Sequence, residues 1–394
     1  MRHTDIAIIG GGVAGATAAA MLGRAGIDSI LIDPHPVYPP DFRCEKLDSG
    51  QLALLAKTGL SDAILPATTP DDHVWLARFG RIVDKRPTRQ SDILYDTLVN
   101  TMRAAIPPSC AFVQGKVAAI STSADRQIVT LSTKEEISAR LVVLATGLNA
   151  ALRRSLGIER IELSGCHSVS IGFDVKPVAQ ANFDFRSLTY FPETIANRMA
   201  YLTLFPVGTN MRANYFVYRD LHDPWLKSFR ANPAATIFAA LPALKNITGD
   251  FEVTSSVDIR PVDLYGVAGY RQSGVVLVGD AFGTSCPAAG TGVSKVLTDV
   301  ERLCNVHIPR WLASPGMGED KIAAFYDDPI KQACDSTSLA RAYFLRSLST
   351  EPGIVWSLRR WSRFFGHLGL GILRKRRERL SFAPPRRLQP AIER

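Results

Sequence analysis

The hydrophobic and polar positions of the first forty residues follow the order strand, tight turn, helix, strand. Ile6–Ile9 is a continuous apolar run, which is typical of a parallel strand buried on both faces. Ala16–Arg24 is rich in helix-forming residues and Gly26 can end this helix. Asp28–Asp33 is a second apolar strand, and a proline cluster follows it. This alternation predicts the first unit of an α/β domain with a parallel sheet.

The α/β pattern continues to about residue 145. Apolar residues at helical spacing predict helices at Leu52–Thr58 and Asp92–Ala105. Short apolar runs predict strands near Phe112–Ile120, Ile128–Ser132 and Leu141–Ala145.

A different pattern begins at Ser168, where apolar and polar residues alternate with a period of two as far as about Arg219. Stretches such as SVSIGFDV and ANYFVYRD are rich in aromatic and β-branched residues and predict a mainly antiparallel sheet. Val275–Val278 is a strand that returns to the first domain, and the chain beyond Leu303 has a helical pattern to about Leu373.

We therefore predict an α/β fold with a Rossmann-type nucleotide-binding domain, an inserted mainly antiparallel β-sheet domain that binds substrate, and a helical C-terminal tail. The predicted boundaries are 1–68, 88–165 and 266–310 for the nucleotide-binding domain, 69–87 and 166–265 for the sheet domain, and 311–394 for the C-terminal helices with their basic tail.

Composition narrows the class of protein. The 394 residues are 46% hydrophobic, which is enough for two buried cores, and no apolar run reaches membrane-spanning length. The six cysteines show neither a CxxC pair nor metal-ligand spacing, so we expect reduced thiols, no metal and a cytoplasmic location. The N-terminal segment after Arg2 could also pass for a signal peptide, but cleavage there would destroy the glycine motif described below.

The charge distribution isolates the C-terminal tail. Residues 359–394 contain eleven Lys and Arg against two acids, which accounts for the whole formal net charge of +9. A basic excess confined to one tail is not the basic face of a nucleic-acid-binding protein. Two interpretations of the tail stay open. Its aromatic and basic residues can lie as an amphipathic helix on an anionic membrane surface, or its apolar side can pack on the sheet domain or on a second subunit.

A glycine motif indicates the first chemistry. Gly10-x-Gly12-x-x-Gly15 lies between the first strand and the first helix, and Asp33 ends the next strand. Glycines at these positions permit a tight turn and a close backbone approach to a pyrophosphate, which the helix N-terminus with Val13 and Ala14 also faces. Asp33 can accept a hydrogen bond from a ribose hydroxyl, so the motif predicts a dinucleotide site.

A second strand-to-helix crossing, GVVLVGDAFGTSCPAAGTGVSKV, is placed to reach the same ligand. Asp280, after Gly279, can accept hydrogen bonds from ribityl or ribose hydroxyls. The amides of Gly290, Thr291, Gly292 and Val293 lie at a helix start, where they can meet a carbonyl edge that becomes negative on reduction. A reduced flavin ring has such an edge, so Pro287, Gly290, Thr291 and Gly292 are the candidates for a flavin-facing loop, in which Pro287 shapes the chain.

Together these segments resemble the para-hydroxybenzoate hydroxylase-like flavoprotein monooxygenases over most of residues 1–305. The resemblance implies FAD as the cofactor, with Asp33 and Asp280 at its two ends. It further implies that Arg43 and Gln90 contact the pyrophosphate and that Val117 belongs to the FAD site. The family pattern also implies that the inserted sheet covers the reacting face of the flavin and binds the substrate.

The chain departs from the family pattern after the third apolar strand. The family usually has an Asp-Gly pair there, linked to FAD and NADPH, whereas this sequence has Thr146, and Asn149 or Ala150 near the usual serine. Arg153 or Arg154 can keep the role of the family arginine. The family often has a histidine directly after its Gly-Asp-Ala sequence, and this chain has Phe282 and Gly283 there instead. Reduction then occurs either by NADPH or NADH docking directly or by a separate flavin reductase.

Candidate substrate contacts come from the inserted sheet. The aromatic candidates are Tyr190, Phe191, Tyr201, Phe205, Tyr215, Phe216 and Tyr218, of which about half should face away because side chains alternate along a strand. The polar candidates are His167, Arg212, His222 and Arg260, and for each a structural role is the stronger interpretation. Cys286 has no neighbouring base that would activate it as a nucleophile, and Lys46 is expected to be a solvated or phosphate-facing charge.

The resulting prediction is an FAD-dependent monooxygenase that uses O2 and a flavin C(4a)-hydroperoxide to insert one oxygen atom into a small aromatic or apolar substrate. No residue is identified that must exchange a proton with the substrate. The alternatives are an FAD-dependent reductase of a prenyl-type lipid, a flavoprotein maturation factor with a protein partner, and a halogenase. A homodimer is also compatible with the sequence.

Overall fold

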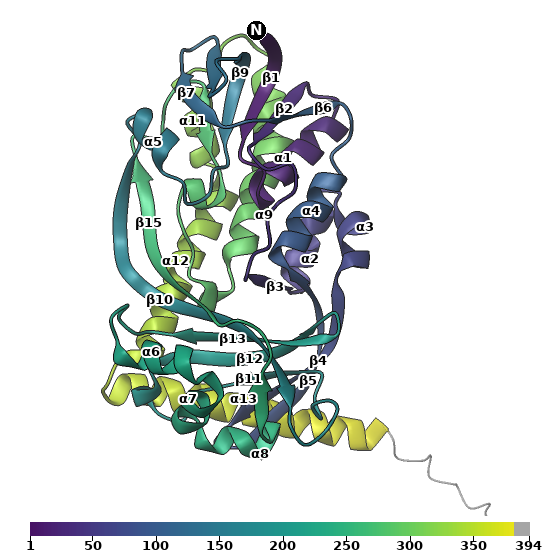
Figure 1. Cartoon of the computed structure of the whole chain (residues 1–394), viewed down its shortest axis with the longest axis vertical. Coiled ribbons are helices and arrows are strands. Elements are labelled where there is room, and N and C mark those ends of the chain that lie inside the picture. The colour runs from purple at the N-terminus through teal and green to yellow at the C-terminus, as the bar shows by residue number, and fades with distance from the viewer. Residues whose placement is uncertain (382–394) are drawn as a thin grey trace, which may run out of the picture.

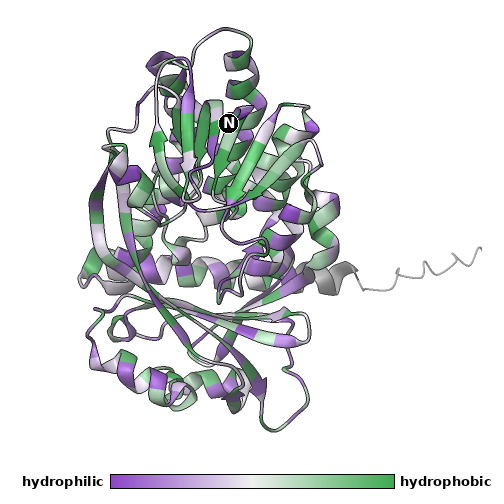
Figure 2. Cartoon of the chain, turned by 45° about the horizontal axis from the view of Figure 1, so that its top comes forward, coloured by the Kyte–Doolittle hydropathy of each residue, from purple (hydrophilic) through white to green (hydrophobic). Residues whose placement is uncertain are grey.

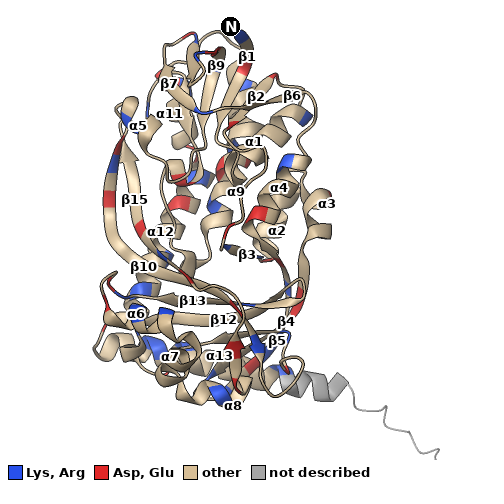
Figure 3. Cartoon of the chain, viewed as in Figure 1, with Lys and Arg blue, Asp and Glu red and all other residues tan. Residues whose placement is uncertain are grey.

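The structure is a computed structural model that describes residues 1–381, with side chains as far as Arg374. The predicted basic tail beyond residue 381 lies outside the described residues. Two sheets lie at opposite ends of the molecule, and the long strands β10 (Glu159–Pro177) and β15 (Asp258–Ala268) run from one to the other (Figure 1). Acidic and basic residues are interspersed over both halves (Figure 3). The predicted α/β fold class is confirmed.

The first sheet has the strand order β6-β2-β1-β9-β8-β7, and β16 pairs with β9. Its strands are β1 (Arg2–Ile9), β2 (Ser29–Asp33), β6 (Cys110–Gln114), β7 (Val117–Ser121), β8 (Gln127–Leu131), β9 (Glu136–Leu144) and β16 (Val275–Leu277). The strands β6, β2, β1, β9 and β16 are parallel, whereas β7 and β8 form antiparallel pairs. The central strands are almost continuously hydrophobic because helices cover the sheet (Figure 2).

Helices α1 (Val13–Arg24), α4 (Tyr95–Ala104) and α9 (Gly292–Arg302) pack together beside this sheet (Figure 1). Two predicted boundaries were wrong. Residues 92–94 complete strand β5 instead of opening α4, because their backbone pairs with β3. The predicted strand near 112–120 is two strands, β6 and β7, since the chain leaves one side of the sheet and rejoins it at the other.

The second sheet has the order β14-β10-β13-β12-β11-β4-β5-β3, and β15 pairs with β10. Its remaining strands are β3 (Cys44–Leu47), β4 (Thr69–Arg78), β5 (Arg81–Leu94), β11 (Ser187–Tyr190), β12 (Met199–Val207), β13 (Asn210–Val217) and β14 (Phe251–Val253). All pairs are antiparallel except β11 with β4. Strand β3 and the end of β5 thus belong to this sheet, although the predicted boundaries place them with the nucleotide-binding segments. The division into domains stays a prediction.

The other helices cover the two sheets and extend the C-terminal part. They are α2 (Ser49–Lys57), α3 (Ser61–Ile64), α5 (Ala151–Ser155), α6 (Pro224–Ala231), α7 (Pro233–Ala240), α8 (Lys245–Thr248), α10 (Ile308–Leu312), α11 (Glu319–Tyr326), α12 (Pro329–Thr350) and α13 (Ile354–Ser381). Helix α12 packs on α9, and α13 packs on β5. In the part of the chain that the structure describes, no helix is long and apolar enough to cross a membrane.

Candidate functional site

The turn between β1 and α1 forms a cradle that only glycine can build. Gly10 has a φ of 101°, and a Cβ added there would lie 2.5 Å from the carbonyl oxygen of Ala145. A Cβ on Gly15 would lie 1.8 Å from the carbonyl oxygen of Gly10. The missing side chains let α1 begin directly against the ends of β1 and β9, so that the N-terminus of the helix opens onto the space above the sheet.

Asp33 closes one side of this cradle. Its carboxylate accepts hydrogen bonds from the amides of Gly11 (2.6 Å) and His35 (2.8 Å). The guanidinium of Arg103 lies 3.3 Å away and donates to the carbonyl oxygens of Gly11 (2.7 Å) and His35 (2.6 Å). Sequence reasoning missed Arg103, because a basic residue in the last turn of α4 carries no motif and only the fold brings it to Asp33.

A cavity of about 1590 Å³ extends from the cradle to the second sheet and to helices α12 and α13. The following predicted residues line it: Gly10, Gly12, Val13, Ala14, Asp33, Arg43, Gln90, Asp280, Pro287, Gly290, Gly292 and Val293. The structure therefore places side chains and backbone from four distant parts of the chain around one space. Their individual contacts with a cofactor stay predictions.

Four predicted residues lie behind the lining of this cavity. Gly15 provides the close helix–strand contact described above, and Val117 is buried in the apolar core beside the first sheet. The amide of Gly279 donates to the carboxylate of Asp299 (2.9 Å). The hydroxyl of Thr291 is 2.7 Å from the hydroxyl of Ser338. In the structure these four residues have packing or hydrogen-bond partners within the protein and do not face the cavity.

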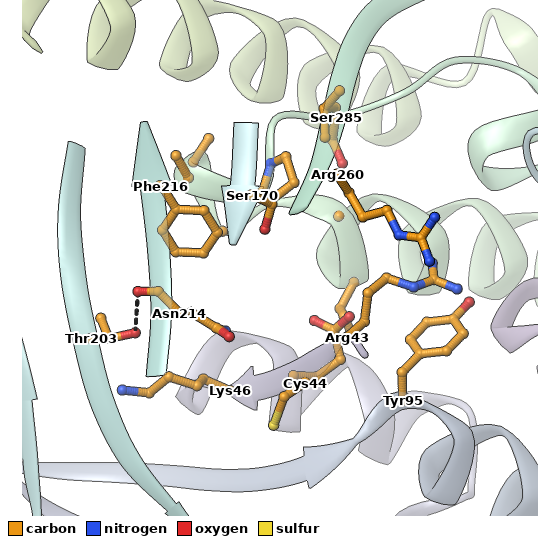
Figure 4. Close-up of a pocket in the computed structure, with 18 of the residues that line it drawn as sticks. Arg43, Cys44, Lys46, Tyr95, Ser170, Thr203, Asn214, Phe216, Arg260 and Ser285 are labelled. Atoms are coloured by element: carbon orange, nitrogen blue, oxygen red, sulfur yellow. Dashed lines mark hydrogen bonds between the residues drawn. The ribbon is translucent and has the colours of Figure 1, made fainter. Parts of the chain in front are cut away.

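Arg43 is fixed inside the cavity by its neighbours. Its guanidinium carbon lies 3.6 Å from the centre of the Tyr95 ring (Figure 4). Its nitrogens contact the carboxylate of Asp41 (2.6 Å) and the hydroxyl of Tyr38 (3.1 Å). Gln90 lies inside strand β5, because this strand continues to Leu94, and the residue at the start of α4 is Tyr95. Arg43 and Tyr95 together present a cation and an aromatic ring to the cavity.

The loop from Gly279 to Val293 is supported by a network of buried charges. Burial raises the pKa of the Asp280 carboxyl, whereas the nearby cations Lys295 and Arg43 lower it. Behind the loop, Lys331 contacts the carboxylates of Asp299 (2.8 Å) and Asp335 (2.9 Å). The side chains of Lys331 and Asp299 are each only 1% exposed. Sequence reasoning missed this network, since its charges resemble the polar face of an ordinary surface helix until α12 packs on α9.

The segment after β9, where the family pattern has its acid, contributes in a different way. Thr146 lines the cavity. Arg153 is buried and donates to the carbonyl oxygen of Ala281 (2.8 Å), so it fastens the Gly279–Ala281 turn from behind. Arg154 is exposed. The side chain of Asn149 accepts from the amide of Ala151 (3.0 Å), the first residue of the short helix α5.

The second sheet supplies the opposite wall. Of the predicted aromatic residues, Phe191, Tyr201 and Phe216 line the cavity, while Tyr190, Phe205, Tyr215 and Tyr218 are buried. Alternation of side chains along β13 explains why Tyr215 faces away from the cavity that its neighbour Phe216 lines. Arg212 and Arg260 also line the cavity.

The predicted histidines have other surroundings. His167 is buried against the hydroxyl of Ser164 (3.1 Å) and the carbonyl oxygen of Ala342 (3.3 Å), and burial lowers its pKa. His222 is exposed and is not among the residues that line the cavity. Cys286 is fully buried beside the hydroxyl of Ser168 (3.5 Å), and burial raises the pKa of its thiol, as expected for an unactivated cysteine.

Lys46 differs from the prediction of a solvated or phosphate-facing charge. It is half-buried, its amine lies 4.7 Å from the centre of the Phe205 ring, and it extends along the cavity toward Thr203 and Asn214 (Figure 4). Burial lowers its pKa. Asp92 lies opposite Lys46 in the β3–β5 pairing, and burial raises the pKa of its carboxyl to about 7. The β3–β5 pairing thus places a cation that lines the cavity opposite a fully buried acid.

The sequence profile of the FAD binding domain family matches residues 3–306. The chain belongs to this family. The match covers most of the chain, so the predicted resemblance is confirmed.

Three proteins illustrate the likeness of this FAD-binding family member to known proteins. Squalene monooxygenase from Mus musculus is 24% identical over 323 residues, which cover 75% of this chain and 53% of that protein. 3-Demethoxyubiquinol 3-hydroxylase from Escherichia coli (strain K12) is 25% identical over 360 residues, 84% of this chain and 88% of that protein. The structure of p-nitrophenol 4-monooxygenase from Pseudomonas putida DLL-E4 has a TM-score of 0.74 at 16% identity and covers 92% of this chain and 94% of that chain. The chain therefore spans about half the length of the squalene monooxygenase that it matches.

The cavity fits FAD. Its glycine cradle is the kind of backbone surface that a pyrophosphate approaches, because any Cβ at Gly10 or Gly15 would collide with backbone. Its volume of about 1590 Å³ exceeds the roughly 300–1,000 Å³ of an ordinary small-molecule pocket, which leaves room for a dinucleotide and a second molecule. When bound, FAD supplies redox and oxygen chemistry that no side chain provides.

Proposed function

We propose that this protein is an FAD-dependent monooxygenase that inserts one oxygen atom from O2 into a small aromatic or apolar organic substrate. The observation that carries the proposal is the single cavity that joins the dinucleotide cradle to an aromatic wall on the second sheet. The relatives support it, since squalene monooxygenase and 3-demethoxyubiquinol 3-hydroxylase are both named for oxygen insertion.

Each wall of the cavity has a distinct task in this proposal. Asp33 with Arg103 binds the adenosine end of FAD, and Arg43 with Gln90 binds the pyrophosphate. Asp280 binds the ribityl chain, and the amides at the start of α9 stabilise negative charge on the reduced ring. Phe191, Tyr201 and Phe216 exclude water and hold the substrate against the cofactor.

The proposed reaction also needs an electron donor that reduces the flavin. We propose NADPH or NADH, docking transiently at the cavity, as the donor. Thr146 lines the cavity where the family has its acid, and this argues for an altered nicotinamide contact. A separate flavin reductase is the alternative, and a homodimer stays compatible with the chain.

The test is anaerobic. The purified protein is loaded with FAD, its absorbance spectrum is recorded, and bleaching is followed after addition of NADH or NADPH with and without a panel of phenols, aromatic acids and prenyl-type lipids. Bleaching that one class of compound accelerates, followed by oxygen-dependent product formation, supports the proposal. Product formation that needs no oxygen would instead identify the prenyl-lipid reductase. A flavin that stays oxidised with both nucleotides points to a separate reductase.

We also propose that the protein works in the cytoplasm and touches a membrane surface through α13. The inner side of this helix packs on the body: Phe364 lies 6.0 Å from Phe79, and Arg374 pairs with Asp84 at 2.8 Å. The outer side presents large apolar side chains that are 50–78% exposed, namely Ile354, Val355, Leu358, Phe365, Leu370, Ile372 and Leu373. Only part of the apolar surface is thus used for internal packing. An exposed apolar stripe beside arginines suits an anionic bilayer.

A further inference from the structure

One end of the cavity carries an unusual concentration of positive charge. Where β4 and β5 pass α12 and α13, the cavity is lined by Arg78, Arg86, Arg341, Arg360, Arg363 and His367. We call these six residues the cationic rim. Figure 3 shows basic residues where β5 passes α13. Three members of the rim, at positions 360, 363 and 367, lie on one side of α13 because they are three and four residues apart.

The rim is not neutralised by acids within residues 1–374. Arg86, Arg341 and Arg363 have no ion pair within 4.0 Å among the described side chains. Arg78 and Arg360 donate to backbone carbonyl oxygens, those of Pro192 (2.8 Å) and Leu348 (3.1 Å).

Two acids act on the rim, and only Asp84 has its charge paired with a cation elsewhere. Glu193 accepts a hydrogen bond from the hydroxyl of Tyr190 (2.6 Å). Asp84 pairs with Arg374 (2.8 Å). The positive charges at this end of the cavity therefore exceed the acids that could balance them.

The members of the rim destabilise one another in their charged forms. Burial and then the charge of Arg360 lower the pKa of Arg78. Burial and then the charges of Arg86 and Arg363 lower the pKa of His367, and Asp84 opposes this shift. Arg86, Arg341 and Arg363 are exposed to solvent, which screens part of this repulsion, and an anion among the rim side chains would relieve the rest. Cations that line a cavity without paired acids favour a ligand with a negative group.

The walls next to the rim are apolar. Phe364 of α13, Phe344 and Leu345 of α12, and Leu76 and Val83 of the second sheet line the same cavity. A ligand that satisfies both surfaces has an apolar body and one anionic head. Arginine is the side chain best suited to such a head, because its planar fork matches the oxygens of a carboxylate or phosphate.

We propose that the cationic rim binds the anionic head group, a carboxylate or a phosphate, of an amphiphilic substrate whose apolar part extends toward the cofactor. The reaction of this substrate rests on the proposed monooxygenase function, but its binding does not, since the rim acts on oxidised and reduced protein alike. The rim thus decides the substrate class: acids with an apolar body are taken, and neutral analogues of the same length are held far less tightly.

Isothermal titration calorimetry on the oxidised, FAD-loaded protein tests this inference with octanoate, octyl phosphate, 1-octanol and inorganic phosphate, all below micelle-forming concentrations. We expect the two anionic amphiphiles to bind at least about tenfold more tightly than 1-octanol at low salt, because charge-assisted arginine contacts are stronger than neutral hydrogen bonds. The comparison of octanoate with octyl phosphate identifies the head group. Equal affinities for octanoate, octyl phosphate and 1-octanol would overturn the proposal, as would inorganic phosphate binding as tightly as octyl phosphate.

Matched variants locate the effect. The double substitution Arg86→Gln and Arg363→Gln removes two exposed members of the rim and should weaken the anionic ligands about tenfold while leaving 1-octanol unchanged. Arg359→Gln is the control, since Arg359 lies on the same helix, is exposed and is not among the residues that line the cavity. An equal loss with Arg359→Gln would show a general charge effect and contradict the rim as a site. Flavin content and melting temperature verify that each variant is folded.

The outcome separates this inference from the proposed function. Anionic amphiphiles that bind through the rim without any oxygenated product leave the inference standing and count against the monooxygenase. Oxygen insertion into a neutral compound, with no rim-dependent binding of acids, would support the monooxygenase and overturn this inference. Binding of the protein to anionic vesicles with no binding of monomeric octanoate or octyl phosphate would also overturn it.

Discussion

The amide of Gly11 donates a hydrogen bond to the carboxylate of Asp33 at 2.6 Å, and this contact ties the glycine turn to the end of β2. Arg103 completes the arrangement at 3.3 Å from the same carboxylate, with only 8% of its side chain exposed. The adenosine end of the cofactor site is therefore built from a backbone amide, an acid and a cation that lie far apart in the sequence.

Substituting Arg103→Met should weaken FAD binding about tenfold and lower the free energy of unfolding by roughly 1–3 kcal/mol, because Asp33 loses the cation beside it in a poorly solvated site. Fluorescence titration of the apoprotein with FAD and urea denaturation measure the two effects. Arg310→Met, at an exposed position of α10, is the matched control and should leave both unchanged. Unaltered FAD affinity in Arg103→Met would show that the ion pair has no role in the site.

Gly15→Ala should abolish FAD binding, because the added Cβ would lie 1.8 Å from the carbonyl oxygen of Gly10 and would force α1 away from β1. The control is Gly366→Ala in α13, where an added Cβ meets no atom within 4 Å. That substitution should be neutral or stabilise the helix by up to about 1 kcal/mol. The measurement is the flavin content of the two purified variants. A Gly15→Ala protein with full flavin content would contradict the role of the glycine cradle in FAD binding.

Asp92 should make stability fall with rising pH. Burial raises the pKa of its carboxyl to about 7 in the folded protein from the model-compound value of 3.8, with Lys46 opposing the shift and Asp71 adding to it. Below about pH 4 the Asp92 carboxyl is mostly protonated in the folded and the unfolded protein alike, so it does not lower the free energy of unfolding. As the pH rises from 4 to 7 the unfolded state ionises first, so the folded state loses up to roughly 4 kcal/mol, and the loss is complete above pH 7.

Asp92→Asn removes this titration. The free energy of unfolding of the variant relative to the original protein should therefore increase between pH 5 and pH 7.5 in urea denaturation. Asp62→Asn, at an exposed position, should show no such trend. A difference between Asp92→Asn and the original protein that is constant over this pH range would contradict the account of a buried, protonated acid.

The exposed stripe of α13 should bind anionic vesicles. The double substitution Leu358→Asp and Phe365→Asp should abolish flotation of the protein with phosphatidylcholine vesicles that contain phosphatidylglycerol, since it places two charges in the apolar face. Val178→Asp, at a residue that is 64% exposed elsewhere on the surface, should have no effect. If the original protein does not float and the double variant instead converts a dimer to a monomer in size-exclusion chromatography, the stripe is a subunit interface.

The sequence pattern was sufficient for the parts of the site that use local chemistry. Gly10, Gly15 and Asp33 could be predicted because a turn, a helix start and a strand end follow one another within the chain, and the second crossing at Asp280 follows the same rule. Arg103 and Lys331 could not be predicted, because their importance depends on which helix packs against which. Gln90 shows a third case: its position in the chain is close to α4, but β5 continues past it and changes its surroundings.

The net charge of the C-terminal part could be predicted from the sequence, but the positions of its charged side chains in the fold could not. The basic excess beyond residue 358 was evident from the sequence. Its division into an inner side that lines the cavity and an outer side that accompanies an apolar stripe depends on the docking of α13 against β5. The same docking joins Arg78 and Arg86 to residues nearly three hundred positions later, which no local pattern contains.

Incorporation of labelled oxygen tests the central claim most directly. The FAD-loaded protein is reduced, given the compound that most accelerates its reduction, and then exposed to ¹⁸O₂, and the product is analysed by mass spectrometry. The account predicts a product that contains one ¹⁸O atom from the gas and none from water. A product whose added oxygen comes from water, or an oxidised product without added oxygen, would contradict the assignment as a monooxygenase.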